Sequence, residues 1–138
     1  MSDELRKRTK AYASTIIRLY VSLPRGREEV AVIGRQLLRS GTSVAAHARE
    51  ASRARSDGEF CSKLDGLLQE ADESELWLEL LGDDCGISNP ITESLLGETS
   101  ELLAIFGDDR EQSQTQWSIG MKKLSFSAFQ GFSFSIPK

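Results

Sequence analysis

Three short breaks divide the first 109 residues into four segments. Leu23-Pro24-Arg25-Gly26 forms the first break, Ser56-Asp57-Gly58 the second, and residues 82–90 the third. Each contains glycine or proline, which disfavour helix interiors. Between the breaks, apolar residues recur every three or four positions and nowhere alternate with period two, which predicts helices. Their expected bounds are about 3–22, 27–54, 57–81 and 90–107, with Ser56 or Asp57 as the N-cap of the third.

Four helices joined by short connections indicate an all-α fold, an antiparallel up-down four-helix bundle. A chain of 138 residues suits one domain of this kind. We expect the bundle to occupy residues 1–109. The charged N-terminus lacks the apolar region of a secretory signal, and no apolar run reaches the roughly 18–20 residues that span a bilayer. These features predict a cytoplasmic protein with no membrane partner.

The second predicted helix has two faces with different chemistry. At about 100° per residue, four arginines share an arc of about 80°. This arginine face consists of Arg35, Arg39, Arg49 and Arg53. The opposite, small-residue face includes Ser40, Gly41, Val44, His47 and Ala48. Because a helical glycine costs about 1 kcal/mol relative to alanine, close packing of another helix must offset Gly41.

Charge is distributed unevenly along the chain. Residues 1–55 hold 12 Lys/Arg against 5 Asp/Glu, whereas residues 56–109 hold 1 against 15. A basic half followed by an acidic half predicts that the two face each other, within one chain or between subunits. Two separately solvated surfaces are the alternative.

The arginine face therefore admits three interpretations. It pairs with the acidic third helix of the same or another subunit, it is merely solvated, or it binds a phosphate backbone. Glu50 beside the arginines, and the absence of aromatic stacking partners on this helix, weigh against a strong nucleic-acid footprint. Ion pairing is the interpretation that we favour.

The sequence gives little support for an enzyme. His47 is the single histidine and falls among alanines on the small-residue face. A di-iron bundle needs a glutamate three residues before each histidine, and Val44 takes that place here. Cys61 and Cys85 match no metal-binding spacing, so we expect reduced cysteines, with an incidental disulfide or a reactive thiol as the alternatives. No phosphate-binding glycine loop is present. We predict no catalytic residue, metal or cofactor.

Residues 110–138 differ in composition from the rest. A polar run over 111–116 precedes four phenylalanines separated by Ser, Gly and Gln, and the stretch 132–136 alternates as a short strand would. We expect a poorly structured tail that is either flexible or docks onto a partner.

Several motifs resemble a known family. They include Gln36-Leu37-Leu38-Arg39-Ser40-Gly41-Thr42-Ser43-Val44, then Arg49-Glu50-Ala51, Trp77-Leu78-Glu79-Leu80-Leu81 and Glu101-Leu102-Leu103-Ala104-Ile105-Phe106. Together they resemble, over about residues 8–106, the bacterial four-helix-bundle family that includes proteins encoded within intervening sequences of large-subunit ribosomal RNA genes. The accessory variability determinants of diversity-generating retroelements are similar to it. His47 stands where that family usually has asparagine, and residues 110–138 resemble nothing in it.

The resemblance implies a short-looped bundle that assembles into a ring-like homo-oligomer, usually a pentamer. No enzymatic activity is established for the family. In the retroelement branch the oligomer binds a reverse transcriptase and nucleic acid through a basic surface. We therefore expect a non-catalytic homo-oligomeric scaffold. The alternative is a nucleic-acid-binding accessory protein that uses the arginine face on RNA or DNA, and a protein partner is a further expectation.

Overall fold

The computed structural model describes the backbone of residues 1–132 and the side chains of residues 1–116 and 118–124. It contains four helices, which are α1 (Asp3–Ser22), α2 (Glu28–Ser52), α3 (Asp57–Asp83) and α4 (Pro90–Phe132). No strand occurs within this range. The all-α, four-helix fold predicted from the sequence is confirmed.

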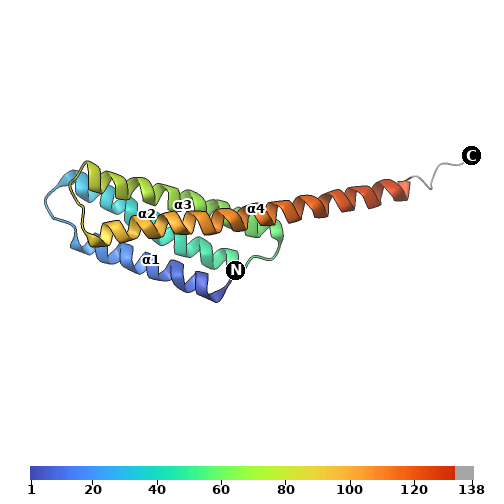
Figure 1. The fold of residues 1–138 in the computed structure, drawn as a ribbon, viewed down its shortest axis with the longest axis horizontal. Coiled ribbons are helices and arrows are strands. Elements are labelled where there is room, and N and C mark those ends of the chain that lie inside the picture. Colours follow the sequence, from blue (N-terminus) through green and yellow to red (C-terminus); the bar gives the residue numbers. More distant parts are fainter. Residues whose placement is uncertain (133–138) are drawn as a thin grey trace, which may run out of the picture.

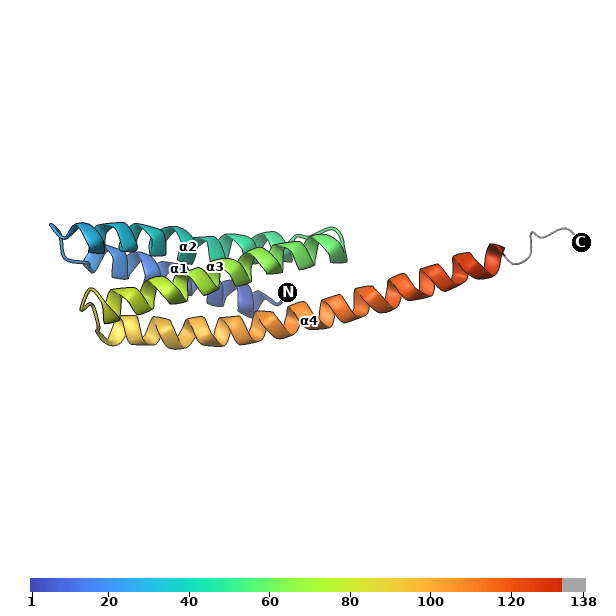
Figure 2. The ribbon, with the colours of Figure 1, turned by 90° about the horizontal axis from the view of Figure 1, so that it is seen from above.

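The helices form an up-down bundle in which each helix packs against the next along the chain (Figure 1). α1 and α4 complete the ring through a smaller contact, and the backbones of the diagonal pairs lie further apart. Seen from above, α4 runs well past the ends of the other three helices (Figure 2). In the described part of the chain, no helix has the length and apolar content needed to cross a membrane.

Local signals fix where three helices begin. Ser2 caps α1 by accepting a hydrogen bond from the amide of Leu5 at 3.2 Å. Ser56, rather than Asp57, caps α3 by accepting from the amide of Glu59 at 3.1 Å. Asn89 caps α4 with its side-chain oxygen, which satisfies amides that have no partner inside the helix. The sequence cues at the second and third breaks therefore act through helix capping, whereas Arg27 at the start of α2 makes no side-chain cap.

The core lies along the axis of the ring. Its largest fully buried side chains are Phe106, Ile16, Leu19, Leu37, Leu64, Leu67, Leu78, Leu81, Leu95, Leu102, Val30 and Val44. Tyr12 also lies inside, where its hydroxyl shares a 2.7 Å hydrogen bond with Thr99 of α4. Burial raises the pKa of Tyr12 above its ordinary value. The bond satisfies a polar group that would otherwise be costly to bury.

α4 is longer than the sequence predicts. It does not end near Gly107 but continues to Phe132, so residues 110–132 are helical rather than irregular. No proline interrupts the chain between Pro90 and Pro137, and a lone strand would have no ladder partner, whereas a helix satisfies its own backbone groups. The strand-like alternation over 132–136 lies, apart from its first residue, outside the described residues.

A basic groove as the candidate functional site

The small-residue face of α2 lies inside the bundle and packs against two helices. On the α1 side, a Cβ atom added to Gly41 would lie 2.8 Å from Cγ1 of Ile16, so the glycine permits the close approach. On the α3 side, the Ser40 and Ser74 hydroxyls share a 2.8 Å hydrogen bond while fully buried. Val44 and Ala48 are also fully buried.

His47 is half-buried at the α2–α3 contact. A Cβ on Gly66 would lie 2.9 Å from the imidazole Cε1, so this glycine makes room for the ring. Among the described residues the Nδ1 atom of His47 has no hydrogen-bond partner, and it lies 3.6 Å from the carboxylate of Glu50. The side chain therefore fills space between two helices.

The arginine face does not act as one surface. Arg39 turns toward α3, where its guanidinium lies 2.8 Å from Glu73 and 3.5 Å from Glu70. Arg49 and Arg53 instead lie beside α1. Arg35 is exposed and belongs to neither group. Because Arg39 and Arg49 stand on opposite flanks of the arc, they face opposite neighbours of α2.

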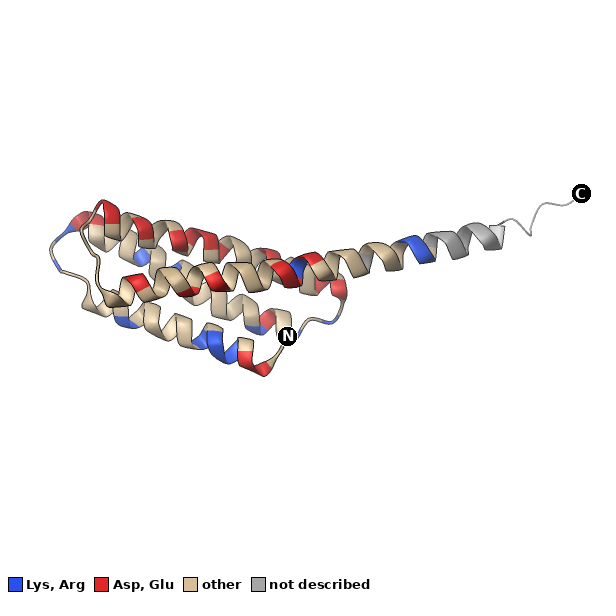
Figure 3. Ribbon diagram, viewed as in Figure 1, with Lys and Arg blue, Asp and Glu red and all other residues tan. Residues whose placement is uncertain are grey.

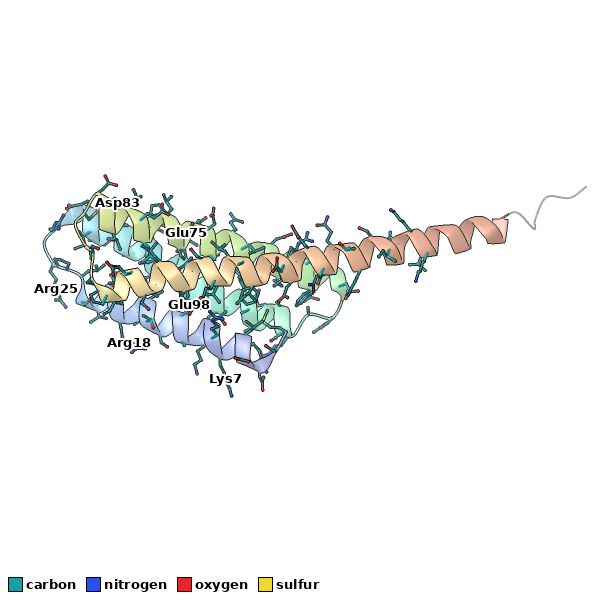
Figure 4. The ribbon with its side chains drawn as sticks, in the orientation of Figure 1. Lys7, Arg18, Arg25, Glu75, Asp83 and Glu98 are labelled. Carbon is teal, nitrogen blue, oxygen red and sulfur yellow. The ribbon has the colours of Figure 1, made fainter. Side chains whose placement is uncertain are left out.

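A groove of about 600 Å³ runs between the first half of α1 and the second half of α2. We call it the basic groove. Its lining consists of Asp3, Arg6, Lys7, Lys10, Ala45, Ala46, Arg49, Glu50 and Arg53. Five cationic side chains thus surround Ala45 and Ala46, whose small side chains line the groove without filling it. Figure 4 shows Lys7 projecting from α1 on the side away from α4.

The two carboxylates of the groove are already engaged. Asp3 pairs with Arg6 one turn along α1. The carboxylate of Glu50 accepts a hydrogen bond from Nζ of Lys63 at 2.9 Å. This hydrogen bond lowers the pKa of Glu50 below its ordinary value. Lys7, Lys10, Arg49 and Arg53 form no ion pair with any described carboxylate. The groove therefore keeps an uncompensated positive charge.

The opposite side of the bundle is acidic. Figure 3 shows Asp and Glu spread along α3 and α4, while Lys and Arg gather on α1 and near the end of α2. Exposed carboxylates there include Asp72, Glu79, Asp83, Asp84 and Glu93. Some residues of the basic half nevertheless form ion pairs with residues of the acidic half of the same chain. This is the intramolecular form of the charge pairing that the sequence predicts.

Arg8 is the clearest of these internal contacts. Its Nε lies 2.6 Å from Glu98 of α4, and its guanidinium also bonds Glu101. The hydrogen bond to Glu98 raises the pKa of Arg8. Figure 4 places Glu98 on α4 above α1. Arg8 thus holds together the two helices with the smallest contact in the ring.

Sequence reasoning missed the α1 half of the groove and the glycine beneath His47. Arg6, Lys7 and Lys10 contributed to the basic count but were not assigned to a face. Lys7 and Lys10 lie three residues apart, a spacing that places them on one helix face. Gly66 lies in the middle of α3, where glycine lowers helix stability by about 1 kcal/mol relative to alanine. A glycine at such a position indicates that a neighbouring group needs the space.

The described residues offer little for metal or covalent chemistry. They contain no group of three or more His, Cys, Asp or Glu side chains able to hold a metal ion. Cys61 and Cys85 are both free, the first half-exposed and the second buried. Four unpaired cations in one groove suit an anionic group, a carboxylate as well as a phosphate.

Comparison with known proteins agrees with the fold. The family model described as 23S rRNA-intervening sequence protein matches residues 3–107. The chain is also similar to a crystal structure from Bacteroides thetaiotaomicron, a protein of unknown function from the S23 ribosomal protein family. The two are 34% identical with a TM-score of 0.69, and the match covers 76% of this chain and 96% of the other. No curated protein matches. The chain belongs to the 23S rRNA-intervening sequence protein family.

Proposed function

We propose that this protein is a non-catalytic helical scaffold that self-associates through the charged sides of its bundle. The observation that carries the proposal is the separation of charge across one small bundle, with an unpaired basic groove on one side and exposed carboxylates on the other. A head-to-tail contact joins unlike patches and closes into a ring when the rotation permits. The family resemblance favours a ring of five copies.

Burial and charge support this arrangement. Ile17 and Val21 of α1 are 46% and 71% exposed and lie further along the α1 side that borders the groove. Apolar residues beside charged groups give a contact between two subunits buried apolar area, whereas complementary charges mainly guide the subunits together. On the acidic side, Leu76 is 47% exposed on a helix rich in carboxylates. Each patch thus offers apolar contacts together with charges of one sign.

The molar mass in solution tests the proposal. We expect an oligomer at micromolar concentration in about 0.1 M salt that dissociates toward 1 M salt, where the screening length falls from about 10 Å to about 3 Å. Arg49→Glu/Arg53→Glu should dissociate it already at low salt. Light scattering on both samples gives the masses.

Lys122→Glu/Lys123→Glu is the matched control, because it makes the same change of charge at exposed positions of α4 outside the groove. The control should keep the wild-type mass. A wild-type monomer at low salt would contradict self-association. An oligomer that tolerates both double variants equally would contradict the role of the groove.

The same groove supports a second candidate function, which is binding the phosphate backbone of RNA or DNA. The specific observation is that four cations converge from two helices and pair with no carboxylate in the described part of the chain; they are Lys7, Lys10, Arg49 and Arg53. Backbone binding needs such cations and no aromatic residue, since it reads charge rather than bases. Of the arginine face, only Arg49 and Arg53 would then contact nucleic acid.

The affinity for a labelled oligonucleotide, measured at several salt concentrations, distinguishes cations that contact phosphates from cations that do not. Lys10→Ala and Arg53→Ala should each weaken binding and lower the slope of log affinity against log salt by about 1. Arg39→Ala should leave the slope unchanged, because Arg39 already pairs with Glu73. Equal losses from Arg39→Ala and Arg53→Ala would reject the groove as the binding surface.

A further inference from the structure

Two pairs of acid and arginine in the basic groove share one spacing but differ in structure. Asp3 precedes Arg6 by three residues on α1, and Glu50 precedes Arg53 by three residues on α2. Residues at this spacing are neighbours on a helix, so opposite charges there tend to pair. Asp3 and Arg6 do form an ion pair, whereas Arg53 pairs with no carboxylate in the described part of the chain. The second arginine is therefore free although an acid lies within reach.

The carboxylate of Glu50 is engaged on the other side of α2. Its Oε2 atom accepts a hydrogen bond from Nζ of Lys63 on α3 at 2.9 Å. Nδ1 of His47 lies 3.6 Å from the same oxygen. On the helical wheel of α2, His47 and Arg53 lie about 60° from Glu50 on opposite flanks. The carboxylate thus turns away from Arg53, although the side chain of Glu50 lines the groove.

Lys63 stands out from the sequence around it. It is the single Lys or Arg among residues 56–109, which carry 15 Asp and Glu. It contacts Glu50 but does not line the groove itself. Glu59, one turn earlier on α3, has the spacing of an ion-pair partner for Lys63, yet it accepts a hydrogen bond from the backbone amide of Arg55 at 3.2 Å. Among the described residues, Glu50 is therefore the one ion-pair partner of Lys63.

We propose that Lys63 is a positioning residue for the basic groove. By holding the carboxylate of Glu50 on the α3 side, it leaves Arg53 free to contact an anionic group in the groove. Without Lys63, Glu50 would pair with Arg53 as Asp3 pairs with Arg6, and the groove would lose one of its four unpaired cations. Arg49 is not an alternative, because residues adjacent in sequence do not face each other on a helix. This role rests on the proposed function, which requires an unpaired groove.

The exposure of both partners determines what the ion pair can do. The side chains of Lys63 and Glu50 are 36% and 47% exposed, so water screens the pair and it contributes little to stability. Its effect falls on binding instead, since each phosphate contact changes the slope of log affinity against log salt by about 1. Substituting Lys63 should therefore alter the groove without unfolding the bundle.

The pKa of Glu50, measured by NMR from its carboxyl carbon, tests the positioning without any ligand. In the wild-type background, Arg53→Ala should change this pKa little, because Lys63 holds the carboxylate. In the Lys63→Met background, Arg53→Ala should raise the pKa clearly, because the carboxylate then depends on Arg53. Equal changes of the pKa in the two backgrounds would overturn the proposal.

A double-mutant cycle tests the effect on the groove, with a labelled single-stranded oligonucleotide as the polyanion. In about 0.1 M salt, Lys63→Met should weaken binding about three- to tenfold and lower the slope of log affinity against log salt by about 1. In a Glu50→Gln background, the same substitution should cost less than about twofold, because no carboxylate is left to occupy Arg53. An equal loss in both backgrounds would show that Lys63 acts through its own charge, and the positioning role would be wrong.

Two single variants complete the comparison. Lys63→Arg should restore wild-type affinity, since arginine also donates to a carboxylate. Lys123→Met removes one charge at an exposed position of α4 outside the groove and should change the affinity by less than about twofold. A loss as large as that of Lys63→Met would contradict the proposal. If no chain binds the oligonucleotide, the phosphate-binding candidate fails, while the pKa of Glu50 still decides whether Lys63 positions it.

Discussion

Replacing Gly41 with leucine is expected to lower the free energy of unfolding by about 1–3 kcal/mol, toward the upper end of that range. A Cβ at this position would already lie 2.8 Å from Cγ1 of Ile16, and Ile16 is fully buried. A leucine adds three further carbons to the same space. Its better helix propensity returns only about 1 kcal/mol. Urea denaturation followed by circular dichroism gives the value.

Two further variants show how much of the loss comes from the clash with Ile16. Ile16→Ala combined with Gly41→Leu should cost less than the two single losses together, because the smaller residue vacates the space that leucine needs. Gly97→Ala in α4 is the matched control, since nothing lies within 4 Å of its added Cβ. It should stabilise the chain by about 0.5–1 kcal/mol. Strict additivity in the first case would show that Gly41 does not set the α1–α2 distance.

The sequence predicts most of the bundle because its signals are local. Ser56, Asn89 and Pro90 act on the backbone within one turn, so the starts of α3 and α4 were readable from single residues. The end of α4 was not readable, since Gly107 does not terminate the helix although it has room there for a Cβ atom, with nothing within 4 Å of it. A glycine can end a helix or sit within one, and only the surrounding structure decides which.

The candidate site was predictable only in part, for a geometric reason. Helical spacing correctly places Arg39, Arg49 and Arg53 on one arc of α2. It does not say which neighbouring helix borders each flank of that arc, because this depends on the order of helices around the ring. The arc is therefore divided, with Arg39 facing α3 and the other two facing Lys7 and Lys10 of α1.

Truncating Phe106 to alanine is expected to be the most damaging single change considered, with a loss of about 3–5 kcal/mol. Phe106 is the last fully buried residue along the described part of α4, and one turn later Arg110 forms an ion pair with Asp65 of α3. Removing its ring leaves a cavity at the end of the bundle that the neighbouring helices cannot fill without moving. Phe106→Leu, which keeps most of the volume, should cost about 1–1.5 kcal/mol.

Ile119→Ala supplies the comparison, because it truncates an apolar residue of the same helix beyond the bundle edge. With 49% of its surface exposed, Ile119 should contribute less than about 0.5 kcal/mol to unfolding. The contrast locates the end of the cooperatively folded unit between two residues of one continuous helix. A loss above about 1 kcal/mol for Ile119→Ala would place the part of α4 beyond the bundle edge inside that unit. In that case the polar edge formed by Arg110 and Asp65 would be an internal layer of the fold rather than its boundary.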